Sequence, residues 1–246
     1  MNKKAFEMQF NWIFVLVVGA SILIFFTAVA IKQKKVSEST IDITILKSLQ
    51  SIVNSALISP DTEKTISIPN SKIGVSCNKI SVGTSSKQYG NLILFAPSIV
   101  SGDKLMTKTS AFSMPYKVTN LLYMTSPKFR YILVGSSDLA KQVNKSLPAE
   151  MKKEFNDGTV ILENENNYKV RFVFFDGVDD GVLSAFESMA DEDVTALKVS
   201  GNIESGSLDF YKKLGELWVA DGDGLYYIGM NSLIGAVYAD KLETYE

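Results

Sequence analysis

The sequence predicts a mixed α/β (α+β) protein, in which an N-terminal transmembrane helix precedes a mixed-sheet globular domain. Two observations predict this fold class. The run from Trp12 to Ile31 contains no charged residue. Beyond about residue 128, apolar runs of strand length alternate with stretches of helical spacing, which is typical of a sheet with helices packed on it.

The first element is a transmembrane helix at residues 12–31, behind a short N-terminal tail at residues 1–11. At about 1.5 Å per residue this run covers roughly 30 Å, the thickness of a hydrocarbon core. Trp12 stands at one end, where an amphipathic ring favours the interface. Three lysines close the other end: Lys32, Lys34 and Lys35.

A cleaved signal peptide is the alternative interpretation of this segment. Ala28-Val29-Ala30 fits a small-x-small cleavage pattern. The apolar run is longer than the roughly 7–15 residues of a typical signal peptide, which favours an uncleaved signal anchor. Basic residues on the two sides are nearly balanced. The short tail before the span favours an extracytoplasmic soluble domain.

Two resemblances concern this segment. Lys3-Lys4-Ala5-Phe6 and the long apolar helix behind it resemble the leader of type IV pilin-like proteins, although Phe10 stands where those proteins carry a glutamate. The segments FEMQFNWIFVLVVG, RYILVGSS and SLIGAVYA resemble an archaeal family of single-pass membrane proteins of unknown function. This second resemblance implies an anchor and no activity.

An amphipathic helix is expected at residues 39–58, followed by a strand-rich subdomain at 61–127. Ser39-Thr40-Ile41-Asp42 resembles a capping box, apolar residues then recur every three or four positions, and Ser59-Pro60 ends the helix. The helix could pack on its own domain, which we favour, or pair with a second copy. Further on, apolar and polar residues alternate, NLILFA at 91–96 reads as a fully covered strand, and a loop is expected at 101–103.

Residues 128–246 are expected to form an α/β subdomain. Strands are predicted at 130–135, 168–175 and 194–199, with helices at 138–147, from Ala149, and at 181–190. WVA-DGDG-LYYIG reads as a hairpin with a Gly-rich turn, and 232–246 as a final helix without a stop signal.

The composition excludes several kinds of chemistry. The 246 residues include no histidine and one cysteine, Cys77, so the usual His-based nucleophile pairs, zinc sites and Cys-ligated clusters are excluded. We expect a small buried hydrophobe at Cys77 rather than a reactive thiol. An enzyme would have to rely on carboxylates, Lys, Ser or Tyr. The sequence therefore favours a protein without enzymatic activity and without a cofactor.

A candidate ligand site lies at Gly135, Ser136 and Ser137, where a strand is joined to a helix. Such a turn directs backbone N–H groups and the positive end of the helix at an anion. The sequence has only one of the glycines that a nucleotide-binding fold requires. Ser137 or Asp138 is better explained as the N-cap of the helix.

A candidate metal site is formed by three carboxylates after the next strand. They are Asp176, Asp179 and Asp180. Carboxylates at the carboxyl edge of a parallel sheet can hold Mg²⁺, while the alternative is a solvated loop. Asp221-Gly222-Asp223-Gly224 lacks the remaining ligands of a calcium loop and is better explained as a turn.

Charge is divided unevenly along the chain. Residues 1–150 carry 17 Lys/Arg and 8 Asp/Glu, whereas residues 151–246 carry 8 and 19. The scattered basic residues do not predict nucleic-acid binding. The expected partners are the lipid bilayer and, through opposite charge, other copies of the chain. The favoured function is a membrane-anchored interaction or assembly protein; the alternative is a membrane-tethered, Rossmann-like domain that binds a phosphate or another ligand.

Overall fold

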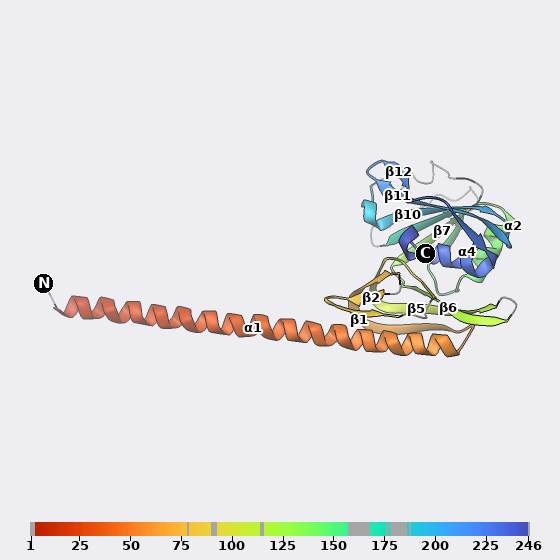
Figure 1. The fold of residues 1–246 in the computed structure, drawn as a ribbon. Coiled ribbons are helices and arrows are strands. Elements are labelled where there is room, and N and C mark those ends of the chain that lie inside the picture. The colour runs from red at the N-terminus through yellow and green to blue at the C-terminus, as the bar shows by residue number, and fades with distance from the viewer. Residues whose placement is uncertain are drawn as a thin grey trace.

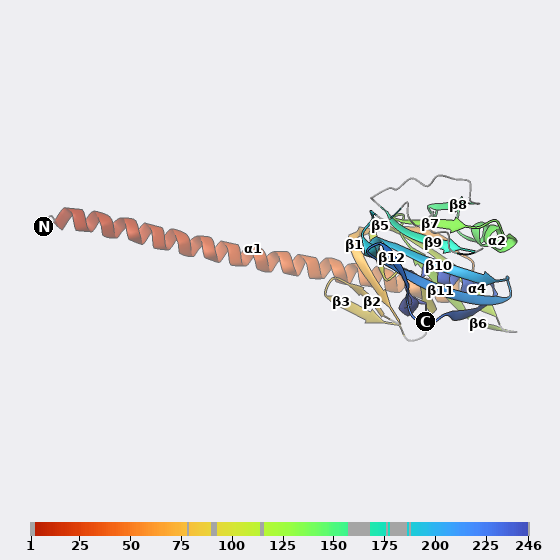
Figure 2. The same cartoon turned by 90° about the horizontal axis from the view of Figure 1, so that it is seen from above.

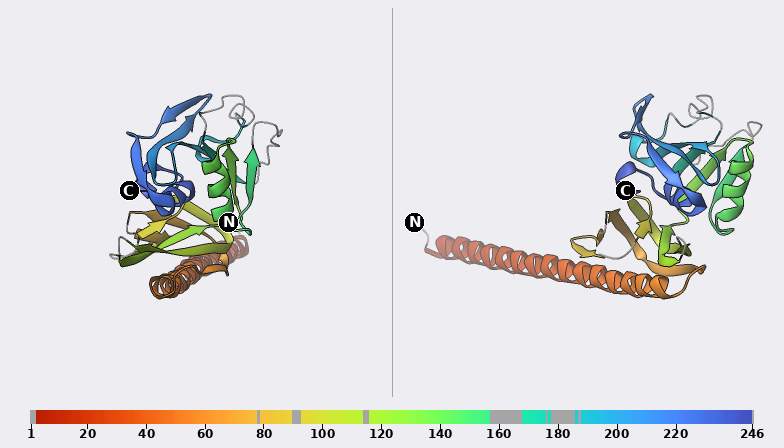
Figure 3. Two further views of the ribbon diagram at one scale, coloured as in Figure 1. Left: turned by 90° about the vertical axis from the view of Figure 1, so that its right-hand side faces the viewer. Right: turned by 45° about the vertical axis from the view of Figure 1, so that its right-hand side comes forward.

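The computed structural model describes residues 3–77, 79–89, 93–113, 116–156, 168–175, 177, 186 and 188–245. A long helix extends from a head that is built of two sheets (Figure 1). Seen from above and along the helix, the head stays at one end of it (Figures 2 and 3). The mixed α/β fold class is confirmed: both antiparallel and parallel strand pairs occur.

Helix α1 runs without interruption over Lys3–Ile58. It is long and apolar enough to cross a membrane, and 0% of its most apolar stretch is buried in the head. Side chains of that stretch stand bare, such as Leu23 and Phe26, which are 70% and 64% exposed. The last turns instead pack on the head through Ile45, Leu49 and Val53.

The expected capping box at residues 39–42 is therefore wrong. Ser39 and Asp42 lie inside α1 rather than at its start, so no helix begins there for Ser39 to cap. Residues 32–58 contain neither glycine nor proline, so the two helices expected at residues 12–31 and 39–58 join into one. The predicted stop before Ser59-Pro60 is confirmed.

The first sheet carries α1 on one face and is mainly antiparallel. Its strand order is β3-β2-β1-β5-β6-β4, in which only the short β4 runs parallel to its neighbour. The expected loop at 101–103 is instead part of β5, because Gly102 with φ +135° continues the strand past the irregular register of β1. The strands are β1 (Glu63–Ser76), β2 (Lys79–Val82), β3 (Ser85–Gln88), β4 (Ile93–Phe95), β5 (Ile99–Ser113) and β6 (Lys117–Thr125).

The second sheet has the order β12-β11-β10-β9-β7-β8, with β13 also paired to β11. β8, β7, β9 and β10 are parallel, and helix α2 (Asp138–Ser146) connects β7 to β8. The predicted strands near 130, 168 and 194 are confirmed. The strands are β7 (Phe129–Val134), β8 (Lys153–Asn156), β9 (Lys169–Phe174), β10 (Val194–Gly201), β11 (Ser205–Leu214), β12 (Leu217–Ala220) and β13 (Leu225–Ile228).

Three sequence expectations in this half need correction. The helix expected from Ala149 is a turn followed by β8, which extends the parallel sheet. The hairpin predicted around DGDG does not form, because β12 and β13 lie end to end along the same edge of β11. The final helix is shorter than predicted: α4 (Gly229–Tyr238) ends before a 3₁₀ turn at Leu242–Thr244. The helix expected at 181–190 lies mostly outside the described residues.

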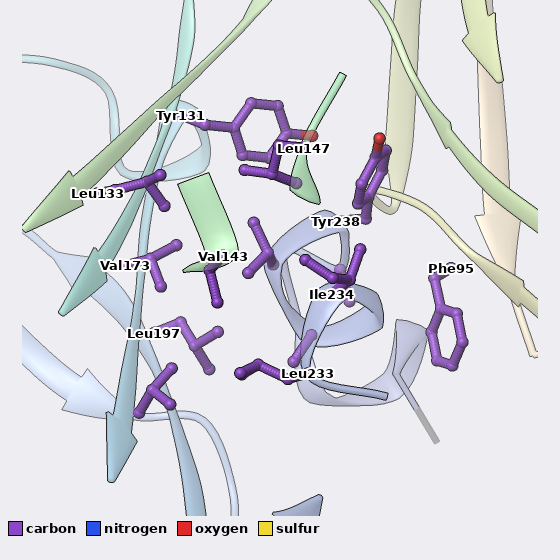
Figure 4. Close-up of a cluster of buried hydrophobic side chains, with 14 of the residues drawn as sticks. Phe95, Tyr131, Leu133, Val143, Leu147, Val173, Leu197, Leu233, Ile234 and Tyr238 are labelled. Carbon is purple, nitrogen blue, oxygen red and sulfur yellow. The ribbon is translucent and has the colours of Figure 1, made fainter. Parts of the chain in front are cut away.

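Helix α4 forms the layer between the two sheets (Figure 1). Leu233, Ile234 and Tyr238 point from it into a cluster that includes Tyr131 and Leu197 of the second sheet (Figure 4). Phe95 of the first sheet covers its other side. A Cβ on Gly235 would lie 2.7 Å from the Phe95 ring, so this position admits no larger residue without a shift. The apolar cluster around α4 is therefore shared by both sheets, while further clusters lie between α1 and the first sheet and on the other face of the second sheet.

Candidate functional site

The turn at Gly135–Ser137 follows β7 and opens α2, as predicted. Gly135 has φ +137° and donates its N–H to the Asn156 carbonyl at 3.0 Å. The Ser137 hydroxyl accepts the N–H of Ala140 at 3.3 Å, so the N-cap assignment is confirmed. Asp138 then places a carboxylate in the first turn of α2, where it opposes a second anion. Two of the turn's polar groups are thus used within the fold.

The second sheet does bring this turn to a place where ligands often bind. The chain leaves β7 towards β8 on one side, and leaves β9 towards β10 on the other. The carboxyl ends of β7 and β9 form such a topological switch point. The Phe175 N–H donates to the Val134 carbonyl at 2.9 Å, which sets the end of β9 beside Gly135.

The predicted metal ligands Asp176, Asp179 and Asp180 lie outside the described residues. Within the described chain, no group of three or more His, Cys, Asp or Glu side chains is placed to hold a metal ion. The Asp221 carboxylate instead accepts from Lys212 Nζ at 3.0 Å and from the Leu242 N–H at 3.3 Å. Partial burial alone would raise the pKa of Asp221, but these two donors lower it.

A buried cation that sequence reasoning missed lies in the second sheet. Arg171 on β9 is 1% exposed and donates to the carbonyls of Ala236, Asp240 and Ala196 at 3.2, 3.3 and 3.1 Å. Burial lowers the pKa of Arg171 to about 10, against the attraction of Asp240. The sequence signal for a buried Arg171 was its position between apolar residues of a strand that was predicted to be buried. Because it faces carbonyls at the C-terminal end of α4, its role is to hold that helix.

Asp240 continues this connection into the first sheet. Its carboxylate accepts from the Ser98 N–H at 2.7 Å and from the Ser98 hydroxyl at 2.8 Å, between β4 and β5. Aromatic rings surround the same region, with Tyr123 and Tyr131 both in ring contact with Tyr238. Burial raises the pKa of all three phenols. These groups join the sheets and are poorly suited to proton transfer near neutral pH.

A groove of about 400 Å³ lies between the end of α1 and the first sheet. Ile52, Ile66 and Leu122 contribute apolar lining, and Lys64 is its one charged residue. Hydroxyls dominate the rest, including those of Ser51, Ser55 and Ser59. Two smaller cavities, of about 100 and 70 Å³, also lie away from Gly135, Ser136 and Ser137. The available sequence signal for the groove was the spacing of Ser48, Ser51, Ser55 and Ser59 at the end of α1.

Cys77 is exposed rather than buried. It lies in the turn just after β1, which ends at Ser76, so it falls outside the alternating pattern on which its predicted burial rested.

Comparison with protein-family models, with curated proteins and with solved structures finds no match to this chain. Its function therefore has to be inferred from the geometry alone.

Proposed function

We propose that this protein is a membrane-anchored, non-enzymatic assembly protein whose head faces the extracytoplasmic side and contacts neighbouring copies. The observation that carries the proposal is α1, one helix whose residues 12–31 are bare and free of charge and whose last turns are built into the head. A flexible linker would let the head tumble, whereas a continuous helix fixes its orientation.

The length of α1 sets where the head would lie. Between Ile31, the last residue of the proposed span, and Ile45, the first buried residue on the sheet, the helix rises roughly 20 Å. The head would therefore stand clear of the lipid headgroups. With height and tilt fixed in this way, the same face of each copy meets its neighbours in the membrane plane, where the effective concentration is high.

Charge supports contact between different faces of the head. Residues 32–128, with the first sheet, carry 12 Lys/Arg and 5 Asp/Glu, whereas residues 129–246, with the second sheet, carry 11 and 21. Ion pairs between described residues include Lys108–Glu63 in the first sheet and Lys212–Asp221 in the second, so they stay within each half. Opposite charge is then available for head-to-tail contact between copies.

The test is chemical crosslinking of the full-length protein in native membranes at low and high salt. We expect ladders of crosslinked copies at about 0.05 M salt that fade at about 1 M, where the Debye length is about 3 Å. A flexible Gly-Ser insertion after Ser37 should weaken the ladders. A matched insertion of seven helix-forming residues, two turns that preserve the helical phase, should weaken them less. A strict monomer at low salt would overturn the proposal.

A second candidate function is the binding of a phosphate-bearing ligand at Gly135–Ser137. The observation in its favour is the switch point between β7 and β9. Phosphate binding is placed second because the Gly135 N–H and the Ser137 hydroxyl already form hydrogen bonds within the fold. The nearby Asp138 carboxylate would also repel an anion. A rise in melting temperature with added inorganic phosphate that Gly135→Val abolishes would support it.

A further inference from the structure

Two preformed features on opposite sides of the head complement each other. One is the groove between α1 and the first sheet, described above. The other is the tip of the β11–β12 hairpin, residues Leu214–Leu217, which we call the hairpin tip. Figure 1 shows β12 on the side of the head away from α1, and Figure 3 agrees. Contact between the two features therefore requires two copies.

We propose that the hairpin tip of one copy docks into the groove of the next. This inference rests on the proposed assembly function and names the surfaces that make the contact. Because the two surfaces differ and lie on opposite sides of the head, the contact is heterologous, and repeated contacts produce a ring or an open array rather than a two-fold dimer.

The hairpin tip has the composition of a docking segment. Leu214 and Leu217 are 52% and 69% exposed at the end of a two-residue turn. Glu216 is exposed between them and forms no ion pair within the described residues. Exposed leucines at a protruding turn are unfavourable in water, so they favour a partner surface.

The hairpin tip is also rigid before it docks. Asp191 accepts the Gly215 N–H at 2.9 Å with one carboxylate oxygen, and the other lies 3.4 Å from Lys213 Nζ. Lys213 is buried and donates to the Met189 carbonyl at 2.6 Å. Bracing of this kind reduces the entropy that is lost on binding.

The groove is preformed by one threonine. The Thr109 hydroxyl donates to the Ser59 carbonyl at 2.8 Å and accepts the Thr62 N–H at 3.0 Å. These bonds fix the chain between α1 and β1, which forms one side of the groove. Ser59 and Thr62 therefore keep their positions whether the groove is filled or empty.

Size and charge match between the two features. A cavity of roughly 150 Å³ can hold a benzene molecule, so about 400 Å³ has room for the two leucine side chains of the hairpin tip. Lys64 is the groove's only charged lining residue and forms no ion pair in the described part of the chain. Glu216 supplies the opposite charge. The leucines would meet Ile52, Ile66 and Leu122 while Glu216 reaches Lys64.

The direct test is a disulfide between two different copies, in full-length protein with Cys77→Ser. One copy carries Glu216→Cys and the other Ser55→Cys, with different affinity tags, and the two are co-expressed and oxidised in native membranes. We expect a linked pair only when both variants are present. In the matched controls, Tyr226→Cys replaces Glu216→Cys on the neighbouring strand, or Lys47→Cys replaces Ser55→Cys on α1 away from the groove. Neither control should link comparably.

Charge exchange provides a second test that keeps the fold intact, since both residues are exposed. Lys64→Glu or Glu216→Lys alone should lower the crosslinked fraction by about tenfold at low salt, and the two together should restore it. A double variant as weak as either single variant would overturn the docking proposal.

The two proposals fail in different ways. If the ladders are sensitive to salt but no disulfide forms between the Glu216→Cys and Ser55→Cys copies, then the copies assemble through other surfaces. That result would overturn the docking proposal and leave the assembly proposal supported. Equal linking of Glu216→Cys to Ser55→Cys and Lys47→Cys would show random collision and also overturn docking. A monomer at low salt would overturn both.

Discussion

Single buried residues join the two halves of the head. Arg171 connects β9 to the end of α4, and Asp240 connects that end to Ser98 of the first sheet. Removing the guanidinium would leave three buried carbonyl groups without their donor, a change of the strongly destabilising kind. These polar groups specify how the sheets are arranged, and the apolar core around them supplies most of the stability.

Alkaline pH should unfold the head because of three buried phenols. Burial raises the pKa of Tyr123, Tyr131 and Tyr238, so each stabilises the fold fully below the ordinary tyrosine pKa of about 10 and loses that contribution as the pH rises further. Arg171 acts in the opposite direction, because its pKa is lowered to about 10 in the folded state. Burial also raises the pKa of Tyr89, Tyr227 and Tyr245 and lowers that of Lys153. The losses outnumber the gains, so the free energy of unfolding is expected to fall as the pH rises above about 10.

Denaturant titrations of the protein in detergent at a series of alkaline pH values measure this slope. Tyr238→Phe keeps the ring contacts but removes one ionisable group, so the slope should decrease by about 1.4 kcal/mol per pH unit. An equal slope in the parent protein and in Tyr238→Phe would contradict the prediction.

At the scale of elements, α1 serves two environments along one axis. Residues 12–31 carry no charge on any side, as a helix that crosses a membrane requires, and the last turns of α1 bury one stripe that includes Ile45, Leu49 and Val53. No residue between these parts interrupts the helix. Substitutions in this buried stripe should therefore change the stability of the head and leave membrane association unchanged.

Leu49→Ala should destabilise the head by about 2–5 kcal/mol, because Leu49 is 1% exposed between α1 and the first sheet. The free energy of unfolding in detergent measures this, and limited proteolysis should show faster cleavage within the head. Lys47→Ala lies on the exposed side of the same turn and should change stability by less than about 0.5 kcal/mol. Equal effects of the two substitutions would mean that α1 does not pack as described.

Element prediction succeeded where side-chain period alone decides the structure. The alternation of Ile73 and Val75, and the apolar run at 131–134, identified strands whose faces are covered as expected. The β12–β13 region failed because a hairpin and two collinear strands have the same local pattern, and pairing with β11 decides between them. The groove could not be predicted from the sequence, because it exists only where α1 crosses the first sheet. The helix-cap role of Ser137 could be predicted, because it depends only on neighbouring residues.

For the whole molecule, the proposed anchor and its orientation can be tested together. We expect the protein to stay in the membrane pellet after carbonate extraction and to need detergent for release, because the bare stretch of α1 is long and apolar enough to cross a bilayer and would otherwise face water. Protease added to intact cells should digest the head if it faces outward.

Digestion only after lysis would reverse the proposed orientation and leave the anchor intact. A soluble chain that begins at Ile31 would show cleavage after Ala30 and contradict the anchor itself. A deliberately truncated protein that begins at Lys32 provides the control, since it should leave the pellet with carbonate.

The central position of α4 has a consequence for the order of events during synthesis. The first sheet is complete in sequence by Thr125, but the helix that covers its inner face ends at Tyr238, and Asp240 follows. At about 5–20 residues per second, the ribosome needs on the order of 10 s to make the intervening chain. Throughout that time Phe95, Leu121 and Tyr123 lack their cover. The head is therefore expected to fold late and as one unit, after the proposed anchor has already been made.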